Sequence, residues 1–181
     1  DVIPDTVNNC ENLYEIYTMA DGKYSGRVTV PILWDKKQNT IVSNESSEII
    51  RMLNSAFDEV GAVKGDYYPD SHKKEIDEIN QKIYKNINNG VYKAGFATTQ
   101  DAYENAVIPL FDTLDWVDEI LGKQKYLVGS SITEADWRLF TTLIRFDPVY
   151  VGHFKCNIRR IVDYQNLQEY IDRLLEYPGV K

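Results

Sequence analysis

Two adjacent polar residues, Glu45 and Ser46, stand where a stretch with helical apolar spacing begins. The spacing over residues 45–57 predicts a helix, so Ser46 lies at its amino end, where free N–H groups and the helix dipole favour a carboxylate. Glu45 can accept a hydrogen bond from a ligand's ammonium group. The pair could therefore hold both kinds of charge. The alternative is that Ser43 or Asn44 simply caps this helix.

Thiol chemistry has two candidates, Cys10 and Cys156, which lie far apart in the sequence. They form no Cys-x-x-Cys motif and no metal-ligand spacing, so we predict no metal site. Cys10 has no proline or tryptophan beside it. Two isolated cysteines fit a reducing, cytoplasmic setting.

The elements that must position these residues begin with two short apolar runs. Residues 28–34 are β-branched and aromatic and predict a strand, and residues 40–42 predict a second strand, joined to the first by a polar turn. The helix over residues 45–57 follows this hairpin. Residues 58–70 contain two glycines, one proline and four acids, a composition typical of a linker.

The rest of the chain has the periodicity of helices. Three apolar stripes have helical spacing: residues 76–91, 102–121 and 167–174. The first stripe fades at residues 88–90, and Pro109 should kink the second. Thr133 and Asp136 are spaced as a capping box at the start of a further helix. The predicted fold class is α+β and mostly α.

Charge and hydropathy exclude several classes of partner. The net charge is −8 and the isoelectric point is near 4.8. Such a negative field repels phosphate backbones and anionic lipids, so we predict no nucleic-acid partner and no membrane association. No apolar run approaches the roughly 20 residues that a membrane helix needs.

The order of these elements, a strand with Val-Pro, a hairpin, Glu-Ser at a helix start and then helices, resembles the cytosolic glutathione transferases. Four stretches carry a more specific resemblance: residues 26–35, 41–52, 89–97 and 145–156. Together they resemble the glutathionyl-hydroquinone reductases, the Xi class of these transferases. The resemblance implies a partial thioredoxin-like domain over residues 1–60, a linker over 61–70, an all-helical domain over 71–181, and assembly as a homodimer.

The resemblance also implies that glutathione is a co-substrate. In the family the proline that matches Pro31 is cis, which turns the backbone of Val30 toward the cysteinyl part of glutathione. Glu45 and Ser46 match the pair that holds the γ-glutamyl end, and Arg27 matches an arginine that contacts glutathione. Taken alone, Val30-Pro31 would indicate only the start of a strand.

Aromatic residues that line the quinol pocket of the family match Tyr92 and Tyr150. Their phenol groups could hydrogen-bond a quinol hydroxyl while their rings pack on it. His153 is a further candidate at the rim of the same pocket. The chain holds thirteen tyrosines, so one tyrosine alone says little.

The catalytic nucleophile of the family is the cysteine of a Cys-Pro-Trp-Ala motif. Its thiolate attacks the sulfur of a glutathionyl-hydroquinone, and a second glutathione resolves the resulting mixed disulfide. These 181 residues contain neither this motif nor the family's C-terminal extension, and Cys156 matches a position that is not the nucleophile. We therefore expect this chain alone to be inactive. The alternatives are a non-catalytic binding or dimerisation module, and an omega-like thiol transferase.

Overall fold

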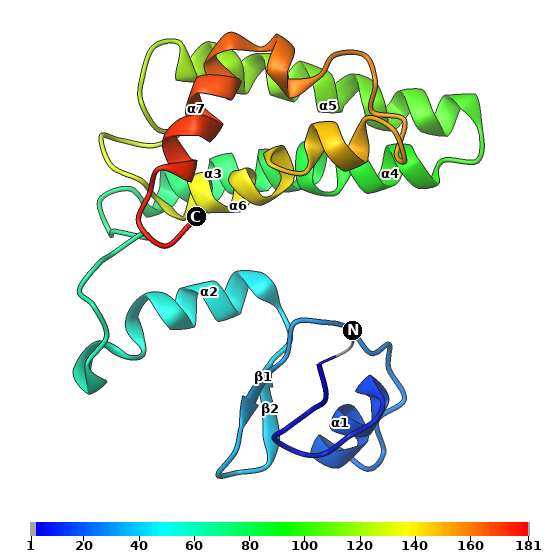
Figure 1. Cartoon of the computed structure of the whole chain (residues 1–181), viewed down its shortest axis with the longest axis vertical. Coiled ribbons are helices and arrows are strands. Elements are labelled where there is room, and N and C mark those ends of the chain that lie inside the picture. Colours follow the sequence, from blue (N-terminus) through cyan, green and yellow to red (C-terminus); the bar gives the residue numbers. More distant parts are fainter. Residues whose placement is uncertain (1–2, 181) are drawn as a thin grey trace. The chain divides into compact units, whose positions relative to one another are not determined.

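The computed structural model describes residues 3–180, and the chain divides into two compact units, Asp1–Gly65 and Asp66–Lys181 (Figure 1). The first unit holds a two-stranded antiparallel hairpin with helices, and the second unit is built from helices. The predicted α+β, mostly α class is confirmed. Within the described residues, no helix combines the length and apolarity that a membrane span requires.

The hairpin of the first unit consists of β1 (Leu33–Asp35) and β2 (Thr40–Ser43). The Asp35 carboxylate accepts hydrogen bonds from the backbone N–H groups of the turn residues Lys37 and Gln38, which closes the turn. The strand predicted over residues 28–34 is wrong in its first part, because pairing begins only at Leu33. The carbonyl groups of Arg27 and Thr29 accept hydrogen bonds from the Tyr24 and Tyr17 hydroxyl groups instead of pairing with a neighbouring strand.

Helix α1 (Leu13–Ala20) was not predicted from the sequence. It begins with a capping box in which the Glu15 carboxylate accepts from the Asn12 N–H at 2.9 Å. Tyr17 is its buried residue. After the hairpin come α2 (Ser46–Ser55) and a short 3₁₀ helix, η1 (Asp58–Val60). Two residues, Asn44 and Glu45, separate the end of β2 from the amino end of α2.

The second unit contains five α-helices among its described residues: α3 (Lys73–Ile83), α4 (Gly90–Phe96), α5 (Gln100–Leu121), α6 (Glu134–Leu143) and α7 (Gln165–Leu175). Two π turns, η2 (Tyr84–Asn88) and η3 (Phe146–Tyr150), and a 3₁₀ turn, η4 (Ile161–Asp163), complete it. Figure 1 shows α4 beside the long α5, which contains Pro109.

The predicted fading of the first helical stripe at residues 88–90 is wrong. The chain passes from α3 through the π turn η2 into α4 and stays helical to Phe96. A polar residue stands at position 88 because its side chain is needed for hydrogen bonds. The Asn88 side-chain amide donates to the Thr142 hydroxyl at 2.6 Å and to the Arg138 carbonyl at 3.2 Å. A polar residue in this stripe therefore cross-links two helices rather than ending one.

The predicted capping box at the start of α6 is confirmed. Asp136 is fully buried and its carboxylate accepts from the N–H of Thr133 at 2.7 Å and of Leu127 at 2.9 Å, and from the Tyr170 hydroxyl at 2.8 Å. Burial raises the pKa of Asp136, although these hydrogen bonds oppose that shift. The box therefore also ties α6 to the preceding loop and to α7.

Candidate functional site

The first unit presents an accessible stretch of backbone at residues 29–31. The peptide bond between Val30 and Pro31 is cis, as the family resemblance implied. Val30 is 73% exposed, and neither its amide nor its carbonyl has a hydrogen-bond partner among the described residues. The neighbouring Thr29 is fixed on both sides, because its carbonyl accepts from the Tyr17 hydroxyl at 2.7 Å and its N–H donates to that oxygen at 3.2 Å. The hydrogen-bonded backbone of Thr29 therefore directly precedes the amide and carbonyl of Val30, which are unpaired within residues 3–180.

The amino end of α2 leaves two polar side chains accessible. Glu45 is the N-cap residue of this helix, and its N–H donates to the Ser43 hydroxyl at 3.1 Å. That hydroxyl in turn donates to the Glu48 carboxylate at 2.8 Å. The Glu45 carboxylate and the Ser46 hydroxyl are exposed and have no hydrogen-bond partner among the described residues. No side chain caps α2, so the alternative of simple capping by Ser43 or Asn44 is not what is observed.

Asn44 joins these two segments. Its side-chain amide donates to the Tyr17 hydroxyl at 3.0 Å and to the Thr29 hydroxyl at 3.2 Å. Val30 and Glu45 each follow a residue of this hydrogen-bonded pair directly, so the backbone next to Pro31 and the amino end of α2 lie side by side. The network of Tyr17, Thr29 and Asn44 is called the Tyr17 network below.

Tyr17, the centre of this network, was not among the candidate residues predicted from the sequence. Burial raises the pKa of Tyr17, but the hydrogen bonds from Thr29 and Asn44 outweigh it and leave that pKa below its usual value. The capping-box spacing of Asn12 and Glu15 was the one signal that a helix carries this tyrosine. Arg27, the remaining candidate of this unit, is exposed, and its guanidinium has no ion-pair partner among the described residues.

The second unit brings two of its predicted site residues together. The hydroxyl groups of Tyr92, on α4, and Tyr150, at the end of η3, lie 3.2 Å apart, and the rings meet edge to face at 5.8 Å. Tyr150 is 2% exposed and Tyr92 is 42% exposed, so only one ring of the pair is open to solvent. The hydrogen bond to Tyr150 and partial burial raise the pKa of Tyr92, and the charge of Arg145 lowers it.

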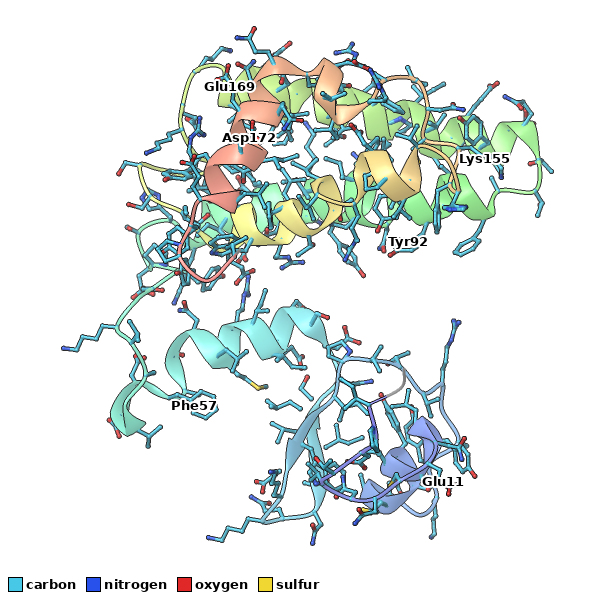
Figure 2. The ribbon with its side chains drawn as sticks, viewed as in Figure 1. Glu11, Phe57, Tyr92, Lys155, Glu169 and Asp172 are labelled. Atoms are coloured by element: carbon cyan, nitrogen blue, oxygen red, sulfur yellow. The ribbon has the colours of Figure 1, made fainter. Side chains whose placement is uncertain are left out.

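Two phenylalanines that sequence reasoning missed complete an aromatic cluster around this pair. The Phe154 ring lies edge to face with Tyr92 at 5.4 Å and with Tyr150 at 5.2 Å. The Phe96 ring stacks on Tyr92 with an interplanar angle of 25°. Tyr92 and Lys155, the residue after Phe154, lie near the same end of this unit in Figure 2.

His153 is exposed, and no described contact joins its side chain to the tyrosine pair.

Neither cysteine has the surroundings of a nucleophile. Burial raises the pKa of Cys156 to about 11, and its thiol faces the carbonyl of Phe154 at 3.6 Å. Desolvation and the charges of Asp5 and Glu15 raise the pKa of Cys10. A reactive thiol needs a lowered pKa, whereas the pKa values of both cysteines are raised, which disfavours the reactive thiolate form. No group of three or more His, Cys, Asp or Glu side chains within residues 3–180 is arranged to hold a metal ion.

Comparison with known proteins gives consistent similarities. The family model described as "Glutathione S-transferase, C-terminal domain" matches residues 100–173. The glutathionyl-hydroquinone reductase PcpF of Sphingobium chlorophenolicum is 59% identical over 180 residues, which cover 99% of this chain and 58% of that protein. The glutathionyl-hydroquinone reductase YqjG of Escherichia coli is 58% identical over 176 residues, covering 97% of this chain and 54% of that one.

Solved structures agree with these relatives. The glutathione-bound structure of YqjG superimposes with a TM-score of 0.96 at 57% identity, covering 99% of this chain and 58% of that chain. The structure of the Xi glutathione transferase ECM4 of Saccharomyces cerevisiae in complex with glutathione gives a TM-score of 0.95 at 41% identity. The match covers 99% of this chain and 60% of that chain. The chain thus spans about half the length of the curated relatives it matches.

Proposed function

Because this chain belongs to the Xi-class glutathione transferases, the family of the glutathionyl-hydroquinone reductases, we propose that it serves glutathione-dependent reduction of glutathionyl-hydroquinones. One observation carries the proposal. The Tyr17 network holds the backbone beside Pro31 next to the amino end of α2, and both present polar groups without partners. This arrangement suits a zwitterionic peptide.

Each part of glutathione finds a suitable group in the first unit. The N–H groups at the start of α2, with the Ser46 hydroxyl, suit the α-carboxylate of the γ-glutamyl end. The Glu45 carboxylate suits its ammonium group. The Val30 amide and carbonyl can pair with the cysteinyl backbone as an added strand does. The Arg27 guanidinium suits the remaining carboxylate.

The tyrosine pair suits the quinol part of the substrate. One phenol can donate to a quinol oxygen while the other accepts from it, because each hydroxyl group can do both. A tyrosine is protonated at neutral pH and the pKa of Tyr92 is raised further, so the pair acts through hydrogen bonds rather than as an anion. His153 contributes to the rim of this pocket in the proposal.

The proposed chemistry exchanges one sulfur bond for another. A cysteine thiolate attacks the glutathionyl sulfur, the bond from that sulfur to the ring breaks, and the ring carbon takes up a proton to give the quinol. A second glutathione reduces the mixed disulfide and leaves as glutathione disulfide. The raised pKa values of Cys10 and Cys156 argue against either thiol as this nucleophile. We assign that role to the family's Cys-Pro-Trp-Ala cysteine, and propose a cytoplasmic homodimer.

Glutathione binding to the 181-residue chain tests the first step by calorimetry. Glu45→Gln removes the charge that faces the ammonium group, and we expect about tenfold weaker binding, since charge-assisted hydrogen bonds contribute about 1.5–3 kcal/mol. Glu59→Gln, an exposed acid of η1, is the matched control and should bind as the wild type does. Equal affinity in both variants would contradict the assignment of Glu45.

Turnover of a glutathionyl-hydroquinone tests the second step. We expect none from this chain, and Cys10→Ser and Cys156→Ser should change nothing. Turnover that Cys10→Ser abolishes would place the nucleophile in the first unit and refute our assignment. Glutathione binding together with an absence of quinol binding would favour the alternative, a non-catalytic glutathione-binding or dimerisation module.

A further inference from the structure

The second unit leaves a large aromatic ring in solvent directly beside the tyrosine pair. Phe96 is 74% exposed, although burying such a side chain usually contributes about 1.5–3 kcal/mol. Its ring is not loose in its surroundings, because it stacks on Tyr92 and lies edge to face with Phe154 at 5.6 Å. An ordered exposed ring is therefore continuous with the tyrosine pair.

The Phe154 ring is fixed within this cluster because it packs closely against α4. A Cβ atom built on Gly95 would lie 2.1 Å from Cδ1 of Phe154, so only glycine leaves room for this ring. The next residue is anchored twice, since the Lys155 ammonium donates to the Gly95 carbonyl at 3.1 Å and its carbonyl accepts from Tyr103 at 2.6 Å. The rings are thus held in place before any ligand arrives.

The order of the rings gives the platform a direction. Tyr92 contacts both Tyr150, whose ring centroid is 5.8 Å away, and Phe96, whose ring centroid is 6.4 Å away. A ligand that places a hydroxyl on the tyrosine pair and lies along Tyr92 reaches Phe96 with its far end. Aromatic rings attract one another most in offset-stacked and edge-to-face arrangements, which this cluster offers.

We propose that Phe96 is a specificity-determining residue, whose exposed face extends the Tyr92–Tyr150 pair into a platform that favours fused, flat aromatic diols over single-ring diols. The inference rests on the proposed function for the hydroxyl contacts but adds a residue and a ligand preference. A single ring that bonds the two hydroxyl groups contacts mainly Tyr92. A fused second ring adds contact with Phe96.

Binding of two diols to the 181-residue chain tests this, with 1,4-dihydroxynaphthalene and 1,4-dihydroxybenzene as probes and tyrosine fluorescence as readout. Phe96→Leu keeps an apolar side chain but removes the aromatic face. It should weaken binding of the naphthalene diol about fivefold, the range of a lost aromatic pair, and change binding of the benzene diol less than about twofold. Ile108→Ala, an exposed apolar residue on α5, is the control and should change neither.

Tyr150→Phe separates this inference from the function on which it rests. If Tyr150→Phe weakens binding of both diols and Phe96→Leu weakens neither, the quinol site stands and the role of Phe96 is refuted. If Phe96→Leu weakens both diols equally, the residue does not set specificity. If the wild type binds neither diol, the proposed quinol site and this inference both fail. Phe96 is exposed, so Phe96→Leu should unfold at the wild-type temperature.

Discussion

Helices α2 and α7 have the same amphipathic character, yet only one of them is buried. Four residues of α7 are buried (Leu167, Tyr170, Ile171 and Leu174), whereas α2 buries none. The same difference separates the two units, because the buried apolar residues lie within residues 76–174, with Tyr17 as the one described exception. Apolar periodicity therefore reveals which face of a helix is apolar, but not what covers it.

The two units consequently depend on different interactions. The second unit has a continuous apolar core, while the first is organised by the hairpin and by the Tyr17 network. The candidate glutathione groups sit directly on that network. We therefore expect ligand binding and local stability to be coupled in the first unit. In the second unit they should be separable at the exposed Phe96 and Tyr92, which lie outside the core, but not at Tyr150, which belongs to it.

Leucine truncation provides the largest test of this comparison. Leu139, on α6, is 0% exposed, so Leu139→Ala should reduce the free energy of unfolding by about 2–5 kcal/mol through lost burial and the cavity left behind. Leu53, on α2, is 55% exposed, and Leu53→Ala should cost about 0.5 kcal/mol or less. Hydrogen exchange, read separately for the two units, gives both values. Similar losses for the two leucines would break the contrast.

Asp136 tests whether the second unit also relies on a polar contact. In Asp136→Asn, either orientation of the amide turns its NH₂ group toward a backbone N–H, of Leu127 or of Thr133. We expect a loss of about 2–3 kcal/mol at neutral pH, measured by urea unfolding. Asp112→Asn, an exposed acid on α5, is the control, and a comparable loss there would remove the special role of Asp136.

The same variant tests the pKa of Asp136 through pH. A carboxyl group whose pKa is raised in the folded state stabilises most below its ordinary pKa of 3.8, and this contribution disappears as the pH rises through the raised value. The stability advantage of the wild type over Asp136→Asn should therefore shrink as the pH rises from about 3.8. An advantage that grows over this range would mean that the hydrogen bonds, and not burial, dominate.

Local rules allowed the sequence to predict some of these features but not others. The capping box at Thr133 and Asp136 and the hairpin were predictable because all their residues are neighbours in sequence. The π turn at Tyr84–Asn88 was not, because Asn88 bonds to Thr142, 54 residues away. A local pattern contains no information about such a distant partner.

The candidate sites divide in the same way. Val30, Tyr92 and Tyr150 came from the family resemblance, whereas Glu45 was also marked by its place at the start of a predicted helix. The structure brings each pair together through contacts across the chain. Phe154 depends on Gly95, 59 positions earlier, and neither residue alone suggests a site. Tyr17 lay outside the elements predicted from the sequence, although the Asn12–Glu15 spacing is that of a capping box.

Tyr17→Phe tests the polar organisation of the first unit with a smaller expected effect. Removing the hydroxyl leaves the Thr29 carbonyl and the Asn44 amide without this partner, which should cost about 1–2 kcal/mol. Glutathione affinity should fall with it, because Val30 and Glu45 lose their mutual position. Calorimetry and hydrogen exchange of residues 13–55 measure the two effects. Tyr14→Phe, an exposed tyrosine on the same helix, should change neither, and a matching loss there would argue against the network.

The smallest effect should come from the surface of the strongly packed second unit. The Lys82 ammonium lies 3.5 Å from the centre of the Trp116 ring, and Lys82→Gln removes this cation–π contact at a cost of about 0.5–1 kcal/mol. Lys85→Gln, an exposed lysine of the adjoining π turn, is the control for the lost charge. Lys82 is exposed whereas Tyr17 is buried. If urea unfolding showed a larger loss of unfolding free energy for Lys82→Gln than for Tyr17→Phe, the unit to which a residue belongs would matter more than whether that residue is buried.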